Sequence, residues 1–181
     1  MRARLRLLLA VYLAAIYSTL GVIRYLTNFL RDHGWLRPTV VLAFAVAGSA
    51  MVWLVFRERR NRSWPVVLTL IAAAIVYACA IYPMDSPEEK IHFIEYGVVG
   101  LLADAASPAS WPPRKRFMLC ELFVIAAGWT DEGIQAILPN RFYDLRDVAF
   151  NAAAGLMALT VLAAIRFATR RRGAPRAEAL P

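Results

Sequence analysis

Residues 39–82 read TVVLAFAVAGSAMVWLVF, then RERRNRSW, then PVVLTLIAAAIVYACAIY. The two flanking segments have 18 residues each and no charged side chain, whereas the residues between them include four arginines. A membrane-spanning helix needs about 20 mostly apolar residues. Basic residues gather in short loops on the cytoplasmic side of a membrane. This stretch therefore predicts two spanning helices joined by a cytoplasmic loop.

The composition of the whole chain agrees with a membrane protein. Of the 181 residues, 60% are hydrophobic and 19% are charged, against about 45–50% and about 25% in a soluble domain. The excess apolar surface must face lipid, which excludes a secreted disulfide scaffold, a disordered chain and an ordinary cytosolic enzyme. The net charge of +8 would suit nucleic acid. However, the basic residues form short clusters between apolar runs, so no nucleic-acid partner is expected.

Six apolar segments are long enough to span a membrane. They cover residues 5–26, 39–56, 65–82, 87–106, 117–138 and 148–167. We therefore expect an all-α, polytopic integral membrane protein in which residues 1–181 form a single transmembrane domain. The first segment has a signal-like basic start but no cleavage site, and it is interpreted as an uncleaved anchor. The fourth begins at a capping box, with Ser86 as the cap and Pro87 as the first helical residue.

The distribution of lysine and arginine predicts the orientation of these spans. If the N-terminus is inside, the inner segments hold 15 of the 21 lysines and arginines. Both termini are therefore expected in the cytoplasm. Residues 168–181 are expected to form a basic cytoplasmic tail at the anionic lipid surface.

Three of the expected spans carry a stripe of polar residues and glycines on one helical face. The stripes contain Glu89, His92 and Tyr96 in the first; Glu121, Gly128, Glu132 and Gln135 in the second; and Asp144, Asp147, Asn151 and Gly155 in the third. Glu95 lies beside His92, and a tight turn at residues 138–141 brings Arg141 to the same end. Ionisable residues inside spans normally face a bundle interior or a cavity, so one outer cluster is expected. Gly97, Gly100 and Gly128 would let the helices approach closely there.

The expected cluster has nine members at the outer end of three consecutive helices. They are His92, Glu95, Tyr96, Glu132, Gln135, Arg141, Asp144, Asp147 and Asn151. Three interpretations stay open: a hydrogen-bonded structural cluster, a ligand-binding pocket, and acid–base catalysis by His92 with Glu132 or Asp147. No cofactor and no metal are expected, because a site with one histidine is a poor zinc site. Asp104 and Glu121 are expected near the inner surface, either solvated or paired with residues 114–116.

Three short segments resemble the VanZ-like membrane protein family. They are EKIHFIEYG at residues 89–97, DEGIQAILPNR at 131–141 and FYDLRD at 142–147, followed by Asn151. The shared pattern is a His with a Tyr four residues later, a Glu-x-x-Gln run ending in Pro-x-Arg, and an Asp with an Asn four residues later. The resemblance covers a core of residues 87–162. The family usually has Gly three residues after the Asn, where this chain has Ala154 followed by Gly155.

The resemblance marks a polar set and implies a place in the cell. The set is His92, Tyr96, Glu132, Gln135, Arg141, Asp147 and Asn151. The family implies a multi-pass protein of the bacterial inner membrane and cell envelope, associated with low-level resistance to the glycopeptide antibiotic teicoplanin.

The leading functional hypothesis is a pocket that binds an amphiphilic envelope molecule. Such a ligand would be a lipid-linked cell-wall intermediate or a lipoglycopeptide. Arg141 would meet its anionic head group, because the guanidinium fork suits phosphate. The other expected partner is membrane lipid, and the sequence does not fix an oligomeric state. One alternative is a membrane enzyme acting on a lipid head group, which is less favoured than ligand binding. The other is a helix-packing partner whose polar cluster is structural.

Overall fold

The computed structural model describes residues 2–84, 86–139, 141 and 143–173, and every regular element in this part of the chain is helical. The elements are α1 (Arg2–Asp32), α2 (Leu36–Phe56), the 3-10 turn η1 (Arg59–Asn61), α3 (Trp64–Ile81), α4 (Pro87–Ala106), α5 (Pro113–Ile137) and α6 (Leu145–Gly173). The prediction of an all-α protein is confirmed. Each of the six expected segments corresponds to one α-helix, and α4 begins at Pro87 as the sequence predicts.

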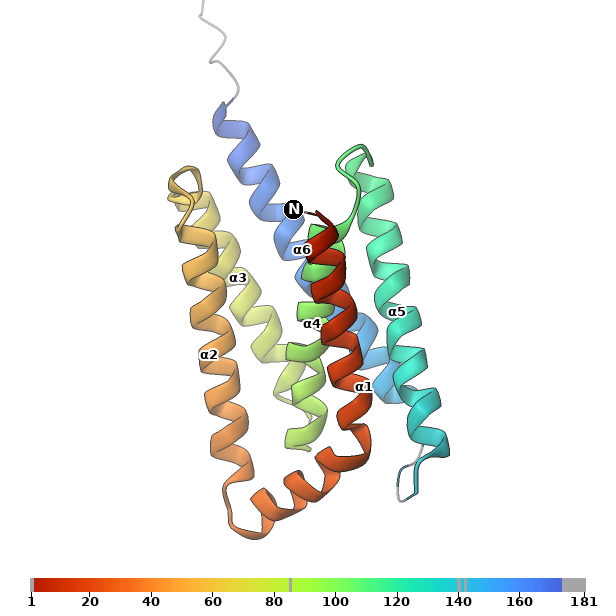
Figure 1. Cartoon of the computed structure of the whole chain (residues 1–181). Coiled ribbons are helices and arrows are strands. Elements are labelled where there is room, and N and C mark those ends of the chain that lie inside the picture. The colour runs from red at the N-terminus through yellow and green to blue at the C-terminus, as the bar shows by residue number, and fades with distance from the viewer. Residues whose placement is uncertain (1, 85, 140, 142, 174–181) are drawn as a thin grey trace, which may run out of the picture.

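The helices run alternately up and down in a bundle (Figure 1). The start of α1, the α2–α3 connection, the α4–α5 connection and the end of α6 lie at one end. We call this the basic end, because the arginine-rich segments at residues 2–6, 57–62, 114–116 and 166–172 belong to it. The α1–α2, α3–α4 and α5–α6 connections lie at the opposite end.

Among the described residues, four helices are long and apolar enough to cross a membrane: α1, α2, α3 and residues Leu145–Arg170 of α6. The expectation of membrane-spanning helices is therefore confirmed in this coarser form. Helices α4 and α5 fall short because they carry the polar stripes. α4 lies among its neighbours, with contacts to α1, α2, α5 and α6, so many of its polar side chains face other helices.

Glycines set the close approach of α4, α5 and α6. A Cβ atom on Gly100 would lie 3.4 Å from the Cα of Gly155, and one on Gly128 would lie 3.0 Å from the Cβ of Asn151. A Cβ on Gly155 would lie 2.6 Å from Val124 Cγ1, too close to be accommodated without a shift. The close approach expected at Gly100 and Gly128 is confirmed, whereas Gly97 has only ordinary contacts, the nearest at 3.7 Å.

Helix α1 is longer than the apolar run that predicted it, and it bends before it reaches α2. Its last turns run across the opposite end of the bundle (Figure 1). Near the bend, the hydroxyl of Thr19 donates to the carbonyls of Ala15 and Ile16, both at 2.9 Å, and the hydroxyl of Ser18 donates to Ala15 at 3.1 Å. Such bonds from Ser and Thr to the preceding turn bend helices. The helix ends at Asp32, and Gly34, two residues later, has a φ of 71°, the left-handed conformation that glycine favours after a helix.

The first residues of the expected basic tail are helical. Helix α6 continues to Gly173, so residues 168–173 are part of this helix. The helix continues because this stretch holds Ala and Arg, which are good helix formers, and no proline. Residues 174–181 of the expected tail lie outside the described residues.

Candidate functional site

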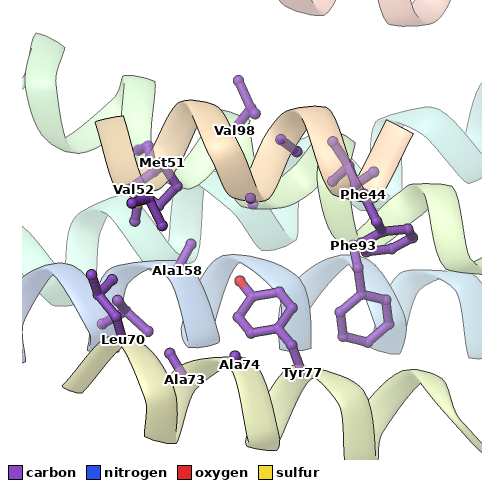
Figure 2. A pocket seen from close by; sticks show the side chains of 16 residues that line it. Phe44, Met51, Val52, Leu70, Ala73, Ala74, Tyr77, Phe93, Val98 and Ala158 are labelled. Atoms are coloured by element: carbon purple, nitrogen blue, oxygen red, sulfur yellow. The ribbon is translucent and has the colours of Figure 1, made fainter. Parts of the chain in front are cut away.

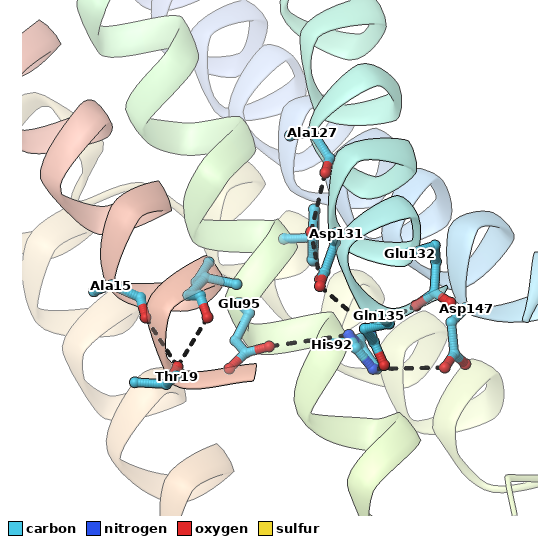
Figure 3. Close-up of polar contacts among 11 residues, drawn as sticks. Ala15, Thr19, His92, Glu95, Ala127, Asp131, Glu132, Gln135 and Asp147 are labelled. Atoms are coloured by element: carbon cyan, nitrogen blue, oxygen red, sulfur yellow. Dashed lines mark hydrogen bonds and ion pairs between the residues drawn. The ribbon is translucent and has the colours of Figure 1, made fainter. Parts of the chain in front are cut away.

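Polar side chains from α4, α5 and α6 come together toward the opposite end of the bundle (Figure 3). They form two layers. The base consists of Tyr96, Asp131, Glu132, Gln135 and Asn151, all of which are buried. The rim consists of His92, Glu95, Arg141 and Asp147, which are partly exposed. The cluster thus has a closed interior and an accessible edge.

The two carboxyl groups of the base share a network of donors. The Tyr96 hydroxyl donates to Asp131 Oδ2 at 2.7 Å. The Gln135 amide donates to Asp131 Oδ1 at 3.2 Å and to Glu132 Oε1 at 2.8 Å. The second oxygen of Glu132, Oε2, accepts the backbone N–H of Asp144 at 2.9 Å. Buried polar groups need such partners, and here they connect α4, α5 and the start of α6.

Asp144 lies just outside α6 rather than on its helical stripe. Its Oδ1 accepts the backbone N–H of Arg146 at 2.8 Å, the bond by which an aspartate caps a helix N-terminus. Because its own N–H donates to Glu132, Asp144 positions the start of α6 against α5. Its contribution to the cluster is made through backbone and capping bonds.

His92 lies at the rim between two carboxyl groups (Figure 3). Its Nδ1 is 3.9 Å from Glu95 Oε2, and its Nε2 is 3.9 Å from Asp147 Oδ2. These separations are too long for hydrogen bonds but short enough for strong electrostatic interaction. The side chains of His92, Asp147 and Glu95 are 15%, 21% and 34% exposed, respectively. A molecule that reaches the rim can therefore contact the imidazole.

Three side chains of the cluster keep hydrogen-bonding capacity that no described residue uses. Among the described residues, His92 Nδ1, Arg141 Nε and both amide atoms of Asn151 are buried without a hydrogen-bond partner. An unsatisfied buried polar group costs about 1–3 kcal/mol. The turn that delivers Arg141 is the predicted one, since its N–H donates to the carbonyl of Leu138 at 3.4 Å. These groups are suited to hold a polar ligand or water.

The expected members of the cluster are thus brought together, and one important residue was not predicted. Asp131 is fully buried and accepts from both Tyr96 and Gln135. It falls off the stripe that contains Glu132 and Gln135, so periodicity did not select it. Its position four residues before Gln135, one helical turn away, was the available signal.

The expectation for Asp104 was wrong. Asp104 is buried and accepts two bonds from the Arg166 guanidinium, at 2.8 and 2.5 Å, rather than pairing with residues 114–116. Its partner lies 62 residues away, so no local pattern could identify it. Arg116 instead donates to the carbonyl of Pro108 at 3.0 Å.

The chemistry of the cluster is acid–base and hydrogen bonding. Among the described residues, no group of three His, Cys, Asp or Glu side chains is placed to hold a metal ion. The arrangement offers one imidazole, four carboxyl groups, two amides, a phenol and a guanidinium. Such a set can bind a head group with both acidic and hydroxyl or amide groups.

Comparisons with protein-family models, with curated proteins and with solved structures gave no match. The described part of the chain is a helical bundle with four helices long and apolar enough to cross a membrane and with a polar site near one end.

Proposed function

We propose that all six α-helices cross the membrane, that both termini are cytoplasmic, and that the polar cluster faces the outer leaflet of a bacterial inner membrane. Two observations support this topology. The arginine-rich segments share one end of the bundle, as expected for cytoplasmic loops. The buried charges of α4 and α5 face other helices, where spans tolerate them.

Fusions to the C-terminus of the full chain test the orientation. We expect green fluorescent protein to fluoresce there and alkaline phosphatase to be inactive, because the first folds in the cytoplasm and the second requires the periplasm. An active phosphatase fusion would reverse the proposed orientation.

We further propose that the cluster binds the polar head of an amphiphilic envelope molecule, as the resemblance to VanZ-like proteins suggests. The observation that carries the proposal is the unused Nε donor of Arg141 at the partly exposed rim. Arginine binds phosphate through several N–H groups in a fixed geometry, and the carboxyl groups beside it accept from hydroxyl or amide groups. The Cα atoms of His92 and Asp147 lie only about 8 Å and about 3 Å from the ends of their helices, which is near the depth of lipid head groups.

Binding of a polyprenyl phosphate by the full chain in nanodiscs tests this proposal. We expect Arg141→Gln to weaken binding about tenfold or more, because a charged hydrogen bond is worth about 1.5–3 kcal/mol. Arg146→Gln is the matched control, since Arg146 has the same charge, lies five residues away and stacks over the Phe150 ring at 5.8 Å. Equal losses in the two variants would show that only bulk charge matters and would contradict the proposed site.

A membrane enzyme acting on a lipid head group is the second candidate. It is favoured by the position of His92 between Glu95 and Asp147, since an imidazole beside a carboxylate is suited to general acid–base catalysis. Turnover of a lipid-linked head group by the purified protein tests it. His92→Asn should abolish turnover, whereas His33→Asn, at the exposed other histidine, should not. Absence of turnover in the unaltered protein would leave binding as the function.

Teicoplanin susceptibility provides a cellular measurement of the same site. We expect Asp147→Asn, at the partly exposed rim, to change susceptibility while the membrane level and melting temperature stay normal. Glu132→Gln should change susceptibility and also lower the melting temperature, because both carboxylate oxygens of Glu132 accept N–H groups. A change that only follows level or melting temperature would indicate that the cluster is structural.

A further inference from the structure

A separate cavity lies on another face of α4, away from the polar cluster. It occupies about 350 Å³ between α2, α3, α4 and α6 (Figure 2), within the usual range of small-molecule pockets. Its walls are almost entirely apolar and include the side chains of Phe44, Met51, Leu70, Phe93 and Val161. The cavity is therefore suited to a molecule that dissolves in the membrane.

One hydroxyl group points into this apolar space. Tyr77 reaches from α3 toward the centre of the cavity (Figure 2), and its ring packs edge-on against Phe93 with centroids 6.3 Å apart. No hydrogen bond of this hydroxyl is found within the described part of the chain, and the oxygen is not among the fully buried unpaired atoms, so a molecule in the cavity can reach it. A tyrosine hydroxyl away from water normally finds a hydrogen-bond partner. The cavity thus offers a single donor to a molecule that is otherwise apolar.

The position of the Tyr77 hydroxyl along α4 limits which molecules can accept its hydrogen bond. A Cβ atom on Gly97 would lie 3.7 Å from the Tyr77 hydroxyl. Gly97 is the eleventh residue of α4, about 15 Å from each end of a 20-residue helix. In the proposed topology α4 crosses the membrane, so the acceptor then lies near the middle of the membrane, whereas the ester groups of glycerolipids lie near its surface. An isoprenoid quinone combines an apolar body, carbonyl acceptors and a position within the membrane interior.

The walls of the cavity also allow a membrane-dissolved molecule to reach it sideways. α2 contacts α1 and α4, and α3 contacts α6, while α2 and α3 have little contact with each other. Apolar side chains of both helices that do not line the cavity, such as Val46 and Leu68, are exposed. A ligand within the bilayer can pass between these helices without crossing the head-group region.

We infer that this cavity binds an isoprenoid quinone, with the Tyr77 hydroxyl donating to a quinone carbonyl and the Phe44 and Phe93 rings lining the quinone ring. This inference does not rest on the proposed head-group site, because the two sites involve different faces of α4.

Photolabelling of the full chain in nanodiscs with an azido-menaquinone, with menaquinone-4 as competitor, tests the inference. We expect label on the cavity walls and a competable affinity. Tyr77→Phe should weaken binding about fivefold, since a neutral hydrogen bond is worth about 1 kcal/mol. Gly48→Leu should weaken it about tenfold or more, because Gly48 lines the cavity and has open space beside it.

The control for cavity filling is Gly21→Leu, at another helical glycine with open space but away from the cavity; it should bind like the unaltered protein. Arg141→Gln should also bind quinone normally, which separates this test from that of the head-group site. Binding that survives Tyr77→Phe in full but is lost in Gly48→Leu would mean that the cavity holds only an apolar chain, and the inference would be wrong. Binding that survives both variants would place the quinone elsewhere and would equally overturn it.

Discussion

Helices α4 and α6 carry polar residues at both ends of their contact. The two groups of residues differ in how many of their hydrogen-bonding atoms have partners. Near the basic end, Asp104 is only 5% exposed. Its two carboxylate oxygens accept hydrogen bonds from the two terminal nitrogens of Arg166, which is 40% exposed. Toward the opposite end, the rim around His92 and Arg141 keeps donors without partners among the described residues. The first group is satisfied by its own two members. The second keeps hydrogen-bonding atoms that no described residue uses and that can bind water or a ligand.

This difference separates stability from recognition. A closed ion pair holds two helices in register and offers nothing to a third molecule. The unpaired atoms of His92, Arg141 and Asn151 cost some stability, which a bound molecule can restore. We therefore expect substitutions near the basic end to affect folding, and substitutions at the rim to affect binding.

The largest effect is expected from breaking the closed pair. Arg166→Met would leave Asp104 buried and unpaired, at a cost of about 3 kcal/mol in the free energy of unfolding, the lower end for a buried pair because Arg166 is partly exposed. The double variant Asp104→Leu/Arg166→Met should recover most of this loss. Unfolding in mixed micelles measures both, and equal losses in the single and double variants would contradict the assignment.

A smaller effect on stability is expected at the contact of α6 with α5, which lies between the Asp104–Arg166 pair and the polar cluster. Gly155→Ala would place a methyl group 2.6 Å from Val124 Cγ1, and overpacking of this kind costs about 2 kcal/mol. Gly133→Ala is the matched control on α5, because it has open space beside it and alanine favours the helix. The melting temperature in detergent should fall for the first variant and rise or stay the same for the second. A fall in both would point to a general intolerance of substitution rather than to the crossing.

A substitution in the base of the cluster should lower the free energy of unfolding by less than Gly155→Ala does. Tyr96→Phe would remove one of the two side-chain donors to Asp131 and should cost about 1–2 kcal/mol. The measurement is again unfolding in mixed micelles. A cost below that of the rim variant described next would show that the base is not the structural layer of the cluster.

The rim should have the smallest effect on stability. Glu95 is 34% exposed, and its contact with His92 is 3.9 Å long. Glu95→Gln should therefore change the free energy of unfolding by less than about 0.5 kcal/mol, as partly exposed ion pairs usually do. A loss as large as that of Arg166→Met would remove the distinction between the two groups.

The sequence predicted the helices better than their ends. The apolar runs located all six α-helices, and Ser86–Pro87 located the start of α4. The apolar run at 5–26 underestimated α1, because a helix continues beyond the membrane-sized part of its pattern. The polar stripes also predicted which residues of α4, α5 and α6 would meet, since helical periodicity determines the face on which each residue lies.

What escaped the sequence was the pairing between distant residues. Asp131 was missed because it lies off the stripe, and the partner of Asp104 was missed because Arg166 looks like one of several arginines near the C-terminus. Periodicity gives the face of one helix, but it does not give the rotation and depth of the next. Those depend on contacts such as the one between Gly100 and Gly155, which only the packed bundle shows.

The central position of α4 has a consequence for how the protein is made. This helix begins with Pro-Glu-Glu-Lys and carries Glu95 and Asp104 further along, so the translocon would release it into lipid reluctantly. Its ion-pair partner Arg166 lies 62 residues after Asp104, so it leaves the ribosome well after α4. In the proposed six-span topology, the nascent chain must therefore keep α4 and α5 close to the insertion machinery until α6 emerges, and a chain truncated before Arg166 should be a substrate for membrane quality-control proteases.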